Sequence, residues 1–432
     1  MIVVTVTFIY KYLMLIMFGV YMVLALVNGF LIDGSGGKPI ERATILIDGS
    51  RIKAVGPSSE IKVPSEAKVI NLDGLTVLPG LIDAHMHFMG TRTHKLEEAF
   101  TVPDQVKLLR CVSDASALLD AGFTTVKDCG GTNGLYLKFA VAEGSIRGPR
   151  IIAAGYALSQ TFGHGDIHFI PIHWAKEKIP TICDGVDDCR RAARYALREG
   201  ADFIKICATG GVMSMRDRPE HTQFSLEEMK AIVEEARKVG TFVTAHAQGT
   251  EGIKMAILAG VKTIDHGIYL DDEAIKMMKE RNVILVPTLS IVNQIVTRGR
   301  EVGIVEWGLV KAMEAFESHL KSVKKAYEAG VKIAVGTDFG GPELWKLGTN
   351  AMELELLVDK VGFKPMDAIV SATKISAEAC GLEKNVGTIE VGKLADILVV
   401  DGNPLEDVRV LRDVRNVKMV LKEGKIEVNK LL

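Results

Sequence analysis

Residues 198–211 read REGADFIKICATGG and contain the unit from which the fold is built. Arg198 to Gly200 end a helix-like segment, and the glycine leads directly into a short apolar strand. A glycine just after a helix, followed by a buried strand, is typical of the αβ half of a βα repeat. The pattern recurs in LLDAGFTTVKDCG, RKVGTFVTAHAQG, ILAGVKTIDHG and YEAGVKIAVGTDFG. It predicts a chain in which helices alternate with parallel strands.

Eight short apolar segments qualify as strands of this repeat, and amphipathic helices such as SLEEMKAIVEEARKVG separate them. Eight parallel strands with intervening helices predict a (β/α)8 barrel over residues 79–382, in the α/β class. A doubly wound open sheet is the alternative, but no Gly-rich phosphate loop follows the first strand. The strands are LIDAHMH, FTTVKDCG, RIIAAG, FIKICATG, FVTAHAQG, TIDHGIY, ILVPTLS and IAVGTDFG.

The two ends of the chain have a different pattern. Residues 22–78 and 383–432 alternate short strands with turn signals such as Asp-Gly. They predict one small β domain built from both termini, with the barrel inserted between them. Residues 1–21 form a hydrophobic extension that has the length of a membrane span. Because the basic region of a signal peptide is missing, we interpret it as a mis-called start, with a membrane anchor as the alternative.

The amino-acid composition limits which classes of protein the chain can belong to. The chain has 432 residues, of which 48% are hydrophobic and 25% are charged, so it is long and apolar enough for a sizeable folded core. Its net charge of −2 gives no electrostatic reason to expect a nucleic acid partner. The six cysteines are scattered and form no CxxC pair, which favours a reduced, cytoplasmic compartment, with attachment to a membrane through residues 1–21 as the alternative.

Polar side chains gather where the predicted strands end, and a barrel carries its catalytic groups at those ends. The first strand ends in His85 and His87, and residues two apart on a strand share a face. Each such residue alone has an ordinary structural explanation, but accidental residues would be scattered along strands and into helices. The set comprises His85, His87, Lys205, His246, His266 and Asp338.

This set has the composition of a metal site. Histidine and carboxylate groups are ligands of zinc and related divalent metals, and six groups exceed the needs of one tetrahedral ion. We therefore expect two ions, roughly 3.5–4 Å apart. An ammonium group cannot ligate a metal, but beside two cations the pKa of Lys205 is expected to fall. The free amine would react with carbon dioxide to give a carbamate that bridges the ions; a snorkelling lysine is the alternative.

The motifs VLPGLIDAHMH, IKICATGGVMS, VTAHAQG, IDHG and VGTDFG resemble the amidohydrolase superfamily. More closely, they are similar to its prolidase-like branch of metal-dependent carboxypeptidases and dipeptidases, often described as imidazolonepropionase-related. The resemblance covers the chain from about Val23 onward and implies a distorted TIM barrel with a composite β-sandwich. It implies two divalent ions, zinc by default, and a carboxylated lysine. The implied ligands are His85, His87 and Asp338 for one ion, His246 and His266 for the other, and Lys205 as the bridge.

The site and the resemblance together predict a hydrolase of amide or peptide bonds in dipeptides or N-acyl amino acids, of the Xaa-Pro or Xaa-Arg/Lys type. Metal-bound hydroxide would attack the carbonyl, and Asp338 would move the proton to the leaving amine. The resemblance implies that His164 and Tyr269 bind the substrate α-carboxylate. It also favours a homo-oligomer. The alternatives are a lactonase, an esterase, an organophosphate hydrolase or a non-catalytic scaffold.

Two loops offer further candidate residues. The segment 156–182 is long for a connection, and long irregular segments of this kind are often functional. Arg216, Arg218 and His221 follow the fourth strand and offer additional charge for a carboxylate. The sequence does not choose between a substrate contact and a surface position for these three side chains.

Overall fold

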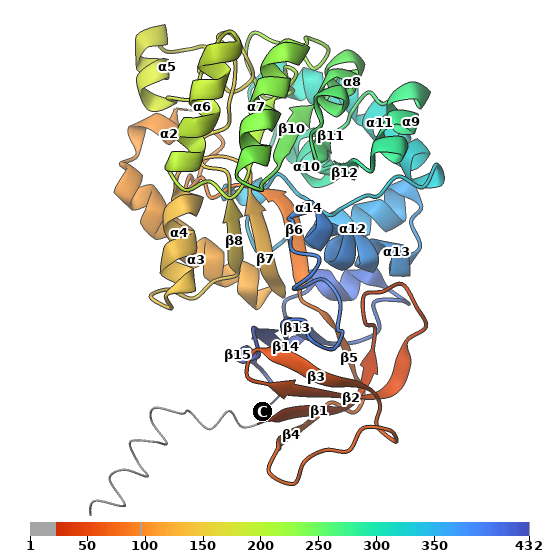
Figure 1. Cartoon of the computed structure of the whole chain (residues 1–432). Coiled ribbons are helices and arrows are strands. Elements are labelled where there is room, and N and C mark those ends of the chain that lie inside the picture. Colours follow the sequence, from red (N-terminus) through yellow and green to blue (C-terminus); the bar gives the residue numbers. More distant parts are fainter. Residues whose placement is uncertain (1–22, 96, 432) are drawn as a thin grey trace, which may run out of the picture.

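The computed structural model describes residues 23–95 and 97–431, so the interpretation of residues 1–21 lies outside the described residues. Figure 1 shows a helix-covered barrel beside a smaller β domain. Within the described part of the chain, no helix has both the length and the apolar character needed to cross a membrane. All six cysteines are buried as free thiols.

The smaller domain is one eight-stranded mixed sheet with the order β15-β14-β13-β5-β1-β2-β3, in which β4 pairs with β1. The antiparallel pairing of β5 with β13 joins the two ends of the chain. Side chains from both ends share one hydrophobic core that includes Leu26, Ile45, Ile397 and Met419. The predicted composite β domain is therefore confirmed. The strands are β1 (Leu24–Leu31), β2 (Ile40–Asp48), β3 (Arg51–Pro57), β4 (Lys68–Asn71), β5 (Leu75–Pro79), β13 (Ile397–Asp401), β14 (Val417–Lys422) and β15 (Lys425–Asn429).

The barrel consists of two parallel sheets that isolated bridges connect. One sheet contains β6 (Leu81–Met86), β7 (Phe123–Asp128) and β8 (Arg150–Ala153). The other contains β9 (Ile204–Cys207), β10 (Val243–Ala247), β11 (Thr263–His266) and β12 (Ile284–Val286). Bridges from Leu158 to Ile206 and from Leu285 to Ile333 connect the sheets around the ring.

The eighth predicted strand is the irregular one. It pairs with β12 at Ile333, and the Ala84 amide on β6 donates to the Val335 carbonyl at 2.8 Å, which closes the barrel. The chain then bends, because the amides of Thr337 and Asp338 both donate to the His85 carbonyl, at 2.9 and 2.7 Å. The prediction of a distorted TIM barrel is confirmed, and this bend is one source of the distortion.

The helices surround the barrel, as Figure 1 shows. A capping box begins α7 (Leu226–Lys238): the Ser225 hydroxyl accepts from the Glu228 amide, and the Glu228 carboxylate accepts from the Ser225 amide. The helices are α2 (Glu98–Thr101), α3 (Asp104–Asp120), α4 (Asn133–Ala142), α5 (Ile172–Lys178), α6 (Val186–Arg198), α7 (Leu226–Lys238), α8 (Thr250–Ala259), α9 (Asp272–Arg281), α10 (Leu289–Arg298), α11 (Glu306–Glu328), α12 (Met352–Leu356), α13 (Pro365–Val370) and α14 (Ser376–Ala379), with the short 3₁₀ helices η1 (Glu343–Trp345) and η4 (Val408–Arg412) and the short π-helices η2 (Leu357–Val361) and η3 (Ser371–Ile375).

Candidate active site

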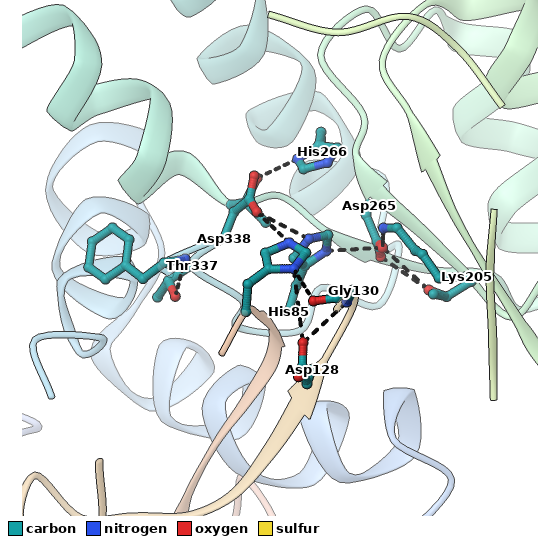
Figure 2. Close-up of polar contacts among 12 residues, drawn as sticks. His85, Asp128, Gly130, Lys205, Asp265, His266, Thr337 and Asp338 are labelled. Carbon is teal, nitrogen blue, oxygen red and sulfur yellow. Dashed lines mark hydrogen bonds and ion pairs between the residues drawn. The ribbon is translucent and has the colours of Figure 1, made fainter. Parts of the chain in front are cut away.

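The predicted ligands converge at the carboxyl ends of the barrel strands. His85 lies on β6, and its Nε2 is 3.4 Å from the Oδ1 of Asp338, which follows the eighth strand segment. The same oxygen is 3.0 Å from His87 Nε2. His85, His266 and Asp338 each offer a ligand atom, and these atoms lie within 4.8 Å of one another. Figure 2 shows these three side chains turned toward one another from three different elements.

The remaining two predicted ligands complete the cluster. In the parallel register, His246 on β10 lies opposite Asp265, the residue before His266 on β11. The rings of His246 and His266 have centroids 4.6 Å apart in an edge-to-face arrangement. Lys205 on β9 is buried and pairs with Asp265, which brings its amine into the same cluster. The structure therefore brings together all six residues that the sequence singled out.

His87, His246 and His266 each have one ring nitrogen hydrogen-bonded to a neighbouring group, and Nδ1 of His85 lies 3.0 Å from the Asp265 carboxylate. This leaves the opposite nitrogen as the ligand atom, which is the usual arrangement of metal-binding histidines. Because such contacts fix both the orientation and the tautomer of the ring, the donor set fits a divalent metal. The contacts are His85 Nδ1 to Asp265 Oδ2 at 3.0 Å, His87 Nδ1 to Gly130 O at 3.2 Å, His246 Nε2 to Gly210 O at 3.1 Å and His266 Nδ1 to Thr288 Oγ1 at 2.7 Å.

Burial and charge also prepare these groups for a cation. Burial, with help from neighbouring cationic groups, holds the pKa of both His246 and His266 well below the usual value, so the rings are neutral and able to ligate. Burial opposes ionisation of Asp338, but His85 and His87 hold its pKa well below the usual range. Burial likewise opposes protonation of His85, yet its anionic neighbours raise its pKa well above the usual value. A metal ion would take the place of that proton.

The backbone of the site is strained at three non-glycine residues. His266, Thr288 and Asp338 have φ angles of 74°, 53° and 59°, in the left-handed region that non-glycine residues avoid. Each such residue costs on the order of 1–3 kcal/mol and persists only where its surroundings hold it. His319 of α11 supplies one such hold, because its Nε2 donates to the His266 carbonyl at 2.9 Å. Two of these three strained residues are candidate ligands, and the third, Thr288, contacts the ring of one of them.

Two buried aspartates belong to the site but were not among the predicted site residues. Asp265 contacts Lys205 and His85 and also accepts hydrogen bonds from two neighbouring threonines. Asp128 ends β7, and its Oδ1 lies 4.0 Å from His87 Nδ1; burial raises its pKa to about 7. Both residues stand at a predicted strand end, in DCG and DHG, so the position that identified the ligands was also the signal for these aspartates.

The predicted substrate contacts differ in their surroundings. The His164 ring stacks on His246 with centroids 4.0 Å apart and an interplanar angle of 18°, so it lies directly against the ligand cluster. Tyr269 follows β11, and its backbone is tied to Gln248 and Thr250. Burial and the nearby acidic groups of Glu220 and Glu314 raise the pKa of Tyr269.

Arg216, Arg218 and His221, the three predicted candidates in the loop after β9, lie at the surface. Arg218 forms an exposed ion pair with Glu314, with Nη2 and Oε2 2.7 Å apart. Arg216 and His221 are exposed. These positions favour the surface interpretation over a direct contact with a substrate in the cluster.

Fold and site together define a class of protein: barrel hydrolases with metal ligands at the carboxyl ends of their strands. The chain belongs to the amidohydrolase family, whose family model matches residues 76–426. Membership makes the protein a hydrolase that acts on amide bonds, in a family that is generally metal-dependent. The predicted resemblance to this superfamily and its prolidase-like members is confirmed.

Individual relatives cover nearly the whole chain. The chain is 35% identical over 422 residues to an ochratoxinase from Aspergillus niger, covering 92% of this chain and 85% of the relative. The chain is also 35% identical to a prolidase whose crystal structure was solved in complex with N-methylphosphonate-L-proline. The two structures superpose with a TM-score of 0.86, over 94% of this chain and 100% of the prolidase chain. A Xaa-Pro dipeptidase with methionine bound in its active site is also 35% identical, with a TM-score of 0.85 and the same coverage.

Proposed function

We propose that this protein is a dinuclear metal-dependent hydrolase of small amides that carry a free carboxylate, such as dipeptides and N-acyl amino acids. The observation that supports this proposal most strongly is the cluster of six candidate ligand groups, in which each histidine has one ring nitrogen in contact with a neighbouring oxygen. Two relatives support the substrate class, because their structures contain L-proline linked to a phosphonate and free methionine. Each of these molecules presents an amino-acid carboxylate.

The chain would hold the two ions with two sets of ligands. The first set is His85, His87 and Asp338; the second is His246 and His266, with Lys205 as the bridge after carboxylation of its amine. Divalent ions in such a site supply a hydroxide near neutral pH and polarise the scissile carbonyl.

Asp338 has the position for proton transfer. Its side chain is 24% exposed, whereas those of His85 and Asp265 are at most 2% exposed, so it faces the open side of the cluster. Its low pKa keeps it ionised and able to accept a proton from the attacking water. We propose that Asp338 then delivers this proton to the nitrogen of the leaving amine, which separates as a neutral product.

Lys205 must give up its present partner before it reacts with carbon dioxide. Burial alone would lower the pKa of Lys205, but the charge and hydrogen bond of Asp265 and the neighbouring thiols together raise it. Divalent ions beside the pair would favour the neutral amine, because they repel the ammonium and attract Asp265. Carboxylation is therefore expected to depend on metal and bicarbonate together.

The test combines metal analysis with a substrate panel. Protein reconstituted with zinc and bicarbonate is expected to bind about two equivalents of metal per chain. It should hydrolyse Xaa-Pro, Xaa-Arg or Xaa-Lys dipeptides or N-acyl amino acids faster than the same molecules with a C-terminal carboxamide. Lactones, esters and organophosphates serve as the competing arms of the panel, and a preference for any of them would overturn the proposed substrate class.

Asp338→Asn is the matched active-site variant, and Asp272→Asn is its control. Asp272 begins α9 with a side chain 88% exposed, far outside the cluster. Asp338→Asn should lower kcat by roughly 10²–10⁴-fold, the usual contribution of a general acid–base. The control should keep wild-type activity. An Asp338→Asn variant with wild-type kcat, or a wild-type protein without bound metal, would refute the proposal.

A further inference from the structure

Helix α10 begins directly after Thr288, the residue that contacts the candidate ligand His266. A threonine at this N-cap position usually accepts a hydrogen bond from an amide of the first helical turn through its hydroxyl oxygen. The Thr288 side chain makes no such bond, and its Oγ1 lies 2.7 Å from His266 Nδ1 instead. Its φ of 53° also departs from the extended conformation of an ordinary capping residue. The amides that begin α10 therefore need another acceptor.

Glu353 of α12 is that acceptor. Its two carboxylate oxygens accept from the backbone amides of Leu289 and Ser290, at 2.8 and 2.7 Å. The Ser290 hydroxyl donates to the same carboxylate at 2.6 Å. One carboxylate thus satisfies the first two amides of a buried helix end, and its negative charge lies at the positive end of the helix dipole. Glu353 performs at α10 the capping role that the N-cap threonine does not.

This arrangement is a costly way to cap a helix. Glu353 is fully buried, and burial raises its pKa to about 7 although the donors of α10 favour the ionised form. A capping threonine hydroxyl would satisfy one of these amides without burying an ionisable group. In the conformation that brings the Thr288 hydroxyl to His266, however, it makes no bond to α10. The helix end and the histidine ring compete for one hydroxyl, and Glu353 removes the competition.

We propose that Glu353 is a positioning residue of the candidate metal site: by capping α10 in place of Thr288, it leaves the Thr288 hydroxyl to orient the ring of His266. This inference rests on the proposed function for the ion that His266 would hold. Without the carboxylate of Glu353, the Thr288 hydroxyl would turn to the amides of α10, as in an ordinary N-cap. The His266 ring would then lose the contact that fixes its tautomer and its orientation.

Glu353→Gln is the central variant. It keeps the shape of the side chain, but its amide nitrogen cannot accept, so only one of the two backbone amides keeps its partner. Glu353→Asp is a second variant, which keeps the charge on a shorter side chain. Ser290→Ala is the matched control, because it removes a hydrogen bond to Glu353 and leaves both amides capped. Glu228→Gln is a further control, since the Glu228 carboxylate also accepts from two backbone amides, away from the metal site.

The first readout is zinc affinity in the presence of bicarbonate, at about pH 8, where Glu353 is ionised. Glu353→Gln is expected to weaken the binding of one of the two ions by about 10–100-fold, the usual loss when a metal-binding histidine loses the group that orients it. Glu353→Asp should lose no more than Glu353→Gln, and both controls should keep the wild-type affinity.

A double-mutant cycle with Thr288→Ala distinguishes positioning from a purely structural role. If Glu353 acts through Thr288, Glu353→Gln should cause no further loss of zinc affinity once Thr288 is replaced, because both changes remove the same contact. A helix cap that affects only stability would give additive losses. Additive losses would therefore overturn the inference.

The second readout reports on the histidine ring in full-length protein before zinc is added. NMR of protein labelled at the histidine ring nitrogens shows which nitrogen carries the proton, and His266→Gln identifies the signal among the ten histidines. In the wild type, His266 should carry its proton on Nδ1, and Glu353→Gln should give a mixture of the two tautomers. A wild-type ring with its proton on Nε2 would overturn the inference. Wild-type zinc affinity in whichever of the two Glu353 variants folds would overturn it as well.

The two readouts separate this inference from the proposed function. A wild-type protein that binds no zinc, but whose His266 tautomer depends on Glu353, would refute the proposed function and support the inference. A wild-type protein that binds two zinc ions and hydrolyses the panel, with a zinc affinity that Glu353→Gln leaves unchanged, would support the proposed function and refute the inference.

Discussion

Thr288→Ala tests whether a contact to the non-ligand ring nitrogen of a histidine controls metal affinity. Thr288 is fully buried, and its Oγ1 lies 2.7 Å from Nδ1 of His266. Burial holds the pKa of His266 low and its ring neutral, and the tautomer that donates from Nδ1 to Thr288 is the one that leaves the Nε2 lone pair for a metal. Without the hydroxyl, the ring can rotate and exchange tautomers. The variant therefore removes the orientation of a ligand and leaves the ligand itself in place.

The expected magnitude follows from the role of such contacts. Loss of the partner that orients a metal-bound histidine usually lowers metal affinity by about 10–100-fold, or ~1.4–2.7 kcal/mol. His266 is one of only two histidines assigned to the second ion, so that ion should lose the affinity. The first ion, assigned to His85, His87 and Asp338, should keep an affinity close to that of the wild type.

The assay is competition for zinc with a chromophoric chelator, with elemental analysis of bound metal. Thr288→Ser is the matched variant: it keeps the hydroxyl, and it relieves the β-branched side chain at φ 53° just as alanine does. Thr124→Ala controls for the loss of a buried threonine, because Thr124 Oγ1 is buried without a hydrogen-bond partner among the described residues. Wild-type zinc affinity in Thr288→Ala, or an equal loss in Thr124→Ala, would refute the reasoning.

Three further changes have defined outcomes. Lys205→Ala should lower hydrolysis by about a hundredfold or more and remove roughly one equivalent of metal, because no bridging anion can form; unchanged metal content would contradict this. Burial lowers the pKa of His319 to about 4, whereas the unfolded chain has the ordinary value of 6.5. The neutral ring of His319 therefore makes its full contribution to the free energy of unfolding above pH 6.5, and this contribution falls by about 3 kcal/mol as the pH drops to 4. His319→Gln keeps a donor for the His266 carbonyl and should flatten the denaturation midpoints between pH 4 and 6.5, whereas equal pH slopes would count against this assignment. Gly134→Ala places a Cβ 2.0 Å from Asp128 Oδ2 and should cost about 1–3 kcal/mol in chemical denaturation, and a wild-type midpoint would show that the site accommodates it.

The barrel and its ligands were predictable from local signals. The glycine that ends a helix and the apolar strand after it lie within a dozen residues, so the repeat is visible without knowledge of distant contacts. His85, Lys205, His246 and His266 are each found by the same rule, a polar residue at or near the end of such a strand. The eighth strand segment was harder to describe, because its bend depends on the His85 carbonyl, about 250 residues away in the chain.

The groups that position the site were not predictable in the same way. His319 lies on α11, where a histidine fits an ordinary amphipathic helix. Its burial and its partner depend on how that helix packs against the loop after β11. The spacing of residues along the sequence gives no indication of this packing. Glu353 lies on α12, and its partners at the start of α10 are 63 and 64 residues away in the chain.

The groups that contact the second ring nitrogen of each candidate histidine differ in how far the sequence specifies them. Two of the four partners are backbone carbonyls, those of Gly130 and Gly210, and a carbonyl is present whatever the side chain. The other two, Asp265 and Thr288, depend on the identity of the residue. Substitution at Asp265 or Thr288 should therefore change metal binding directly. At Gly130 and Gly210 it should act through steric contact: a Cβ at Gly130 would lie 3.3 Å from His87 Cε1, and a Cβ at Gly210 would meet the Arg218 carbonyl at 2.2 Å. Side-chain chemistry selects the ligands of this site, while backbone geometry holds two of them in place.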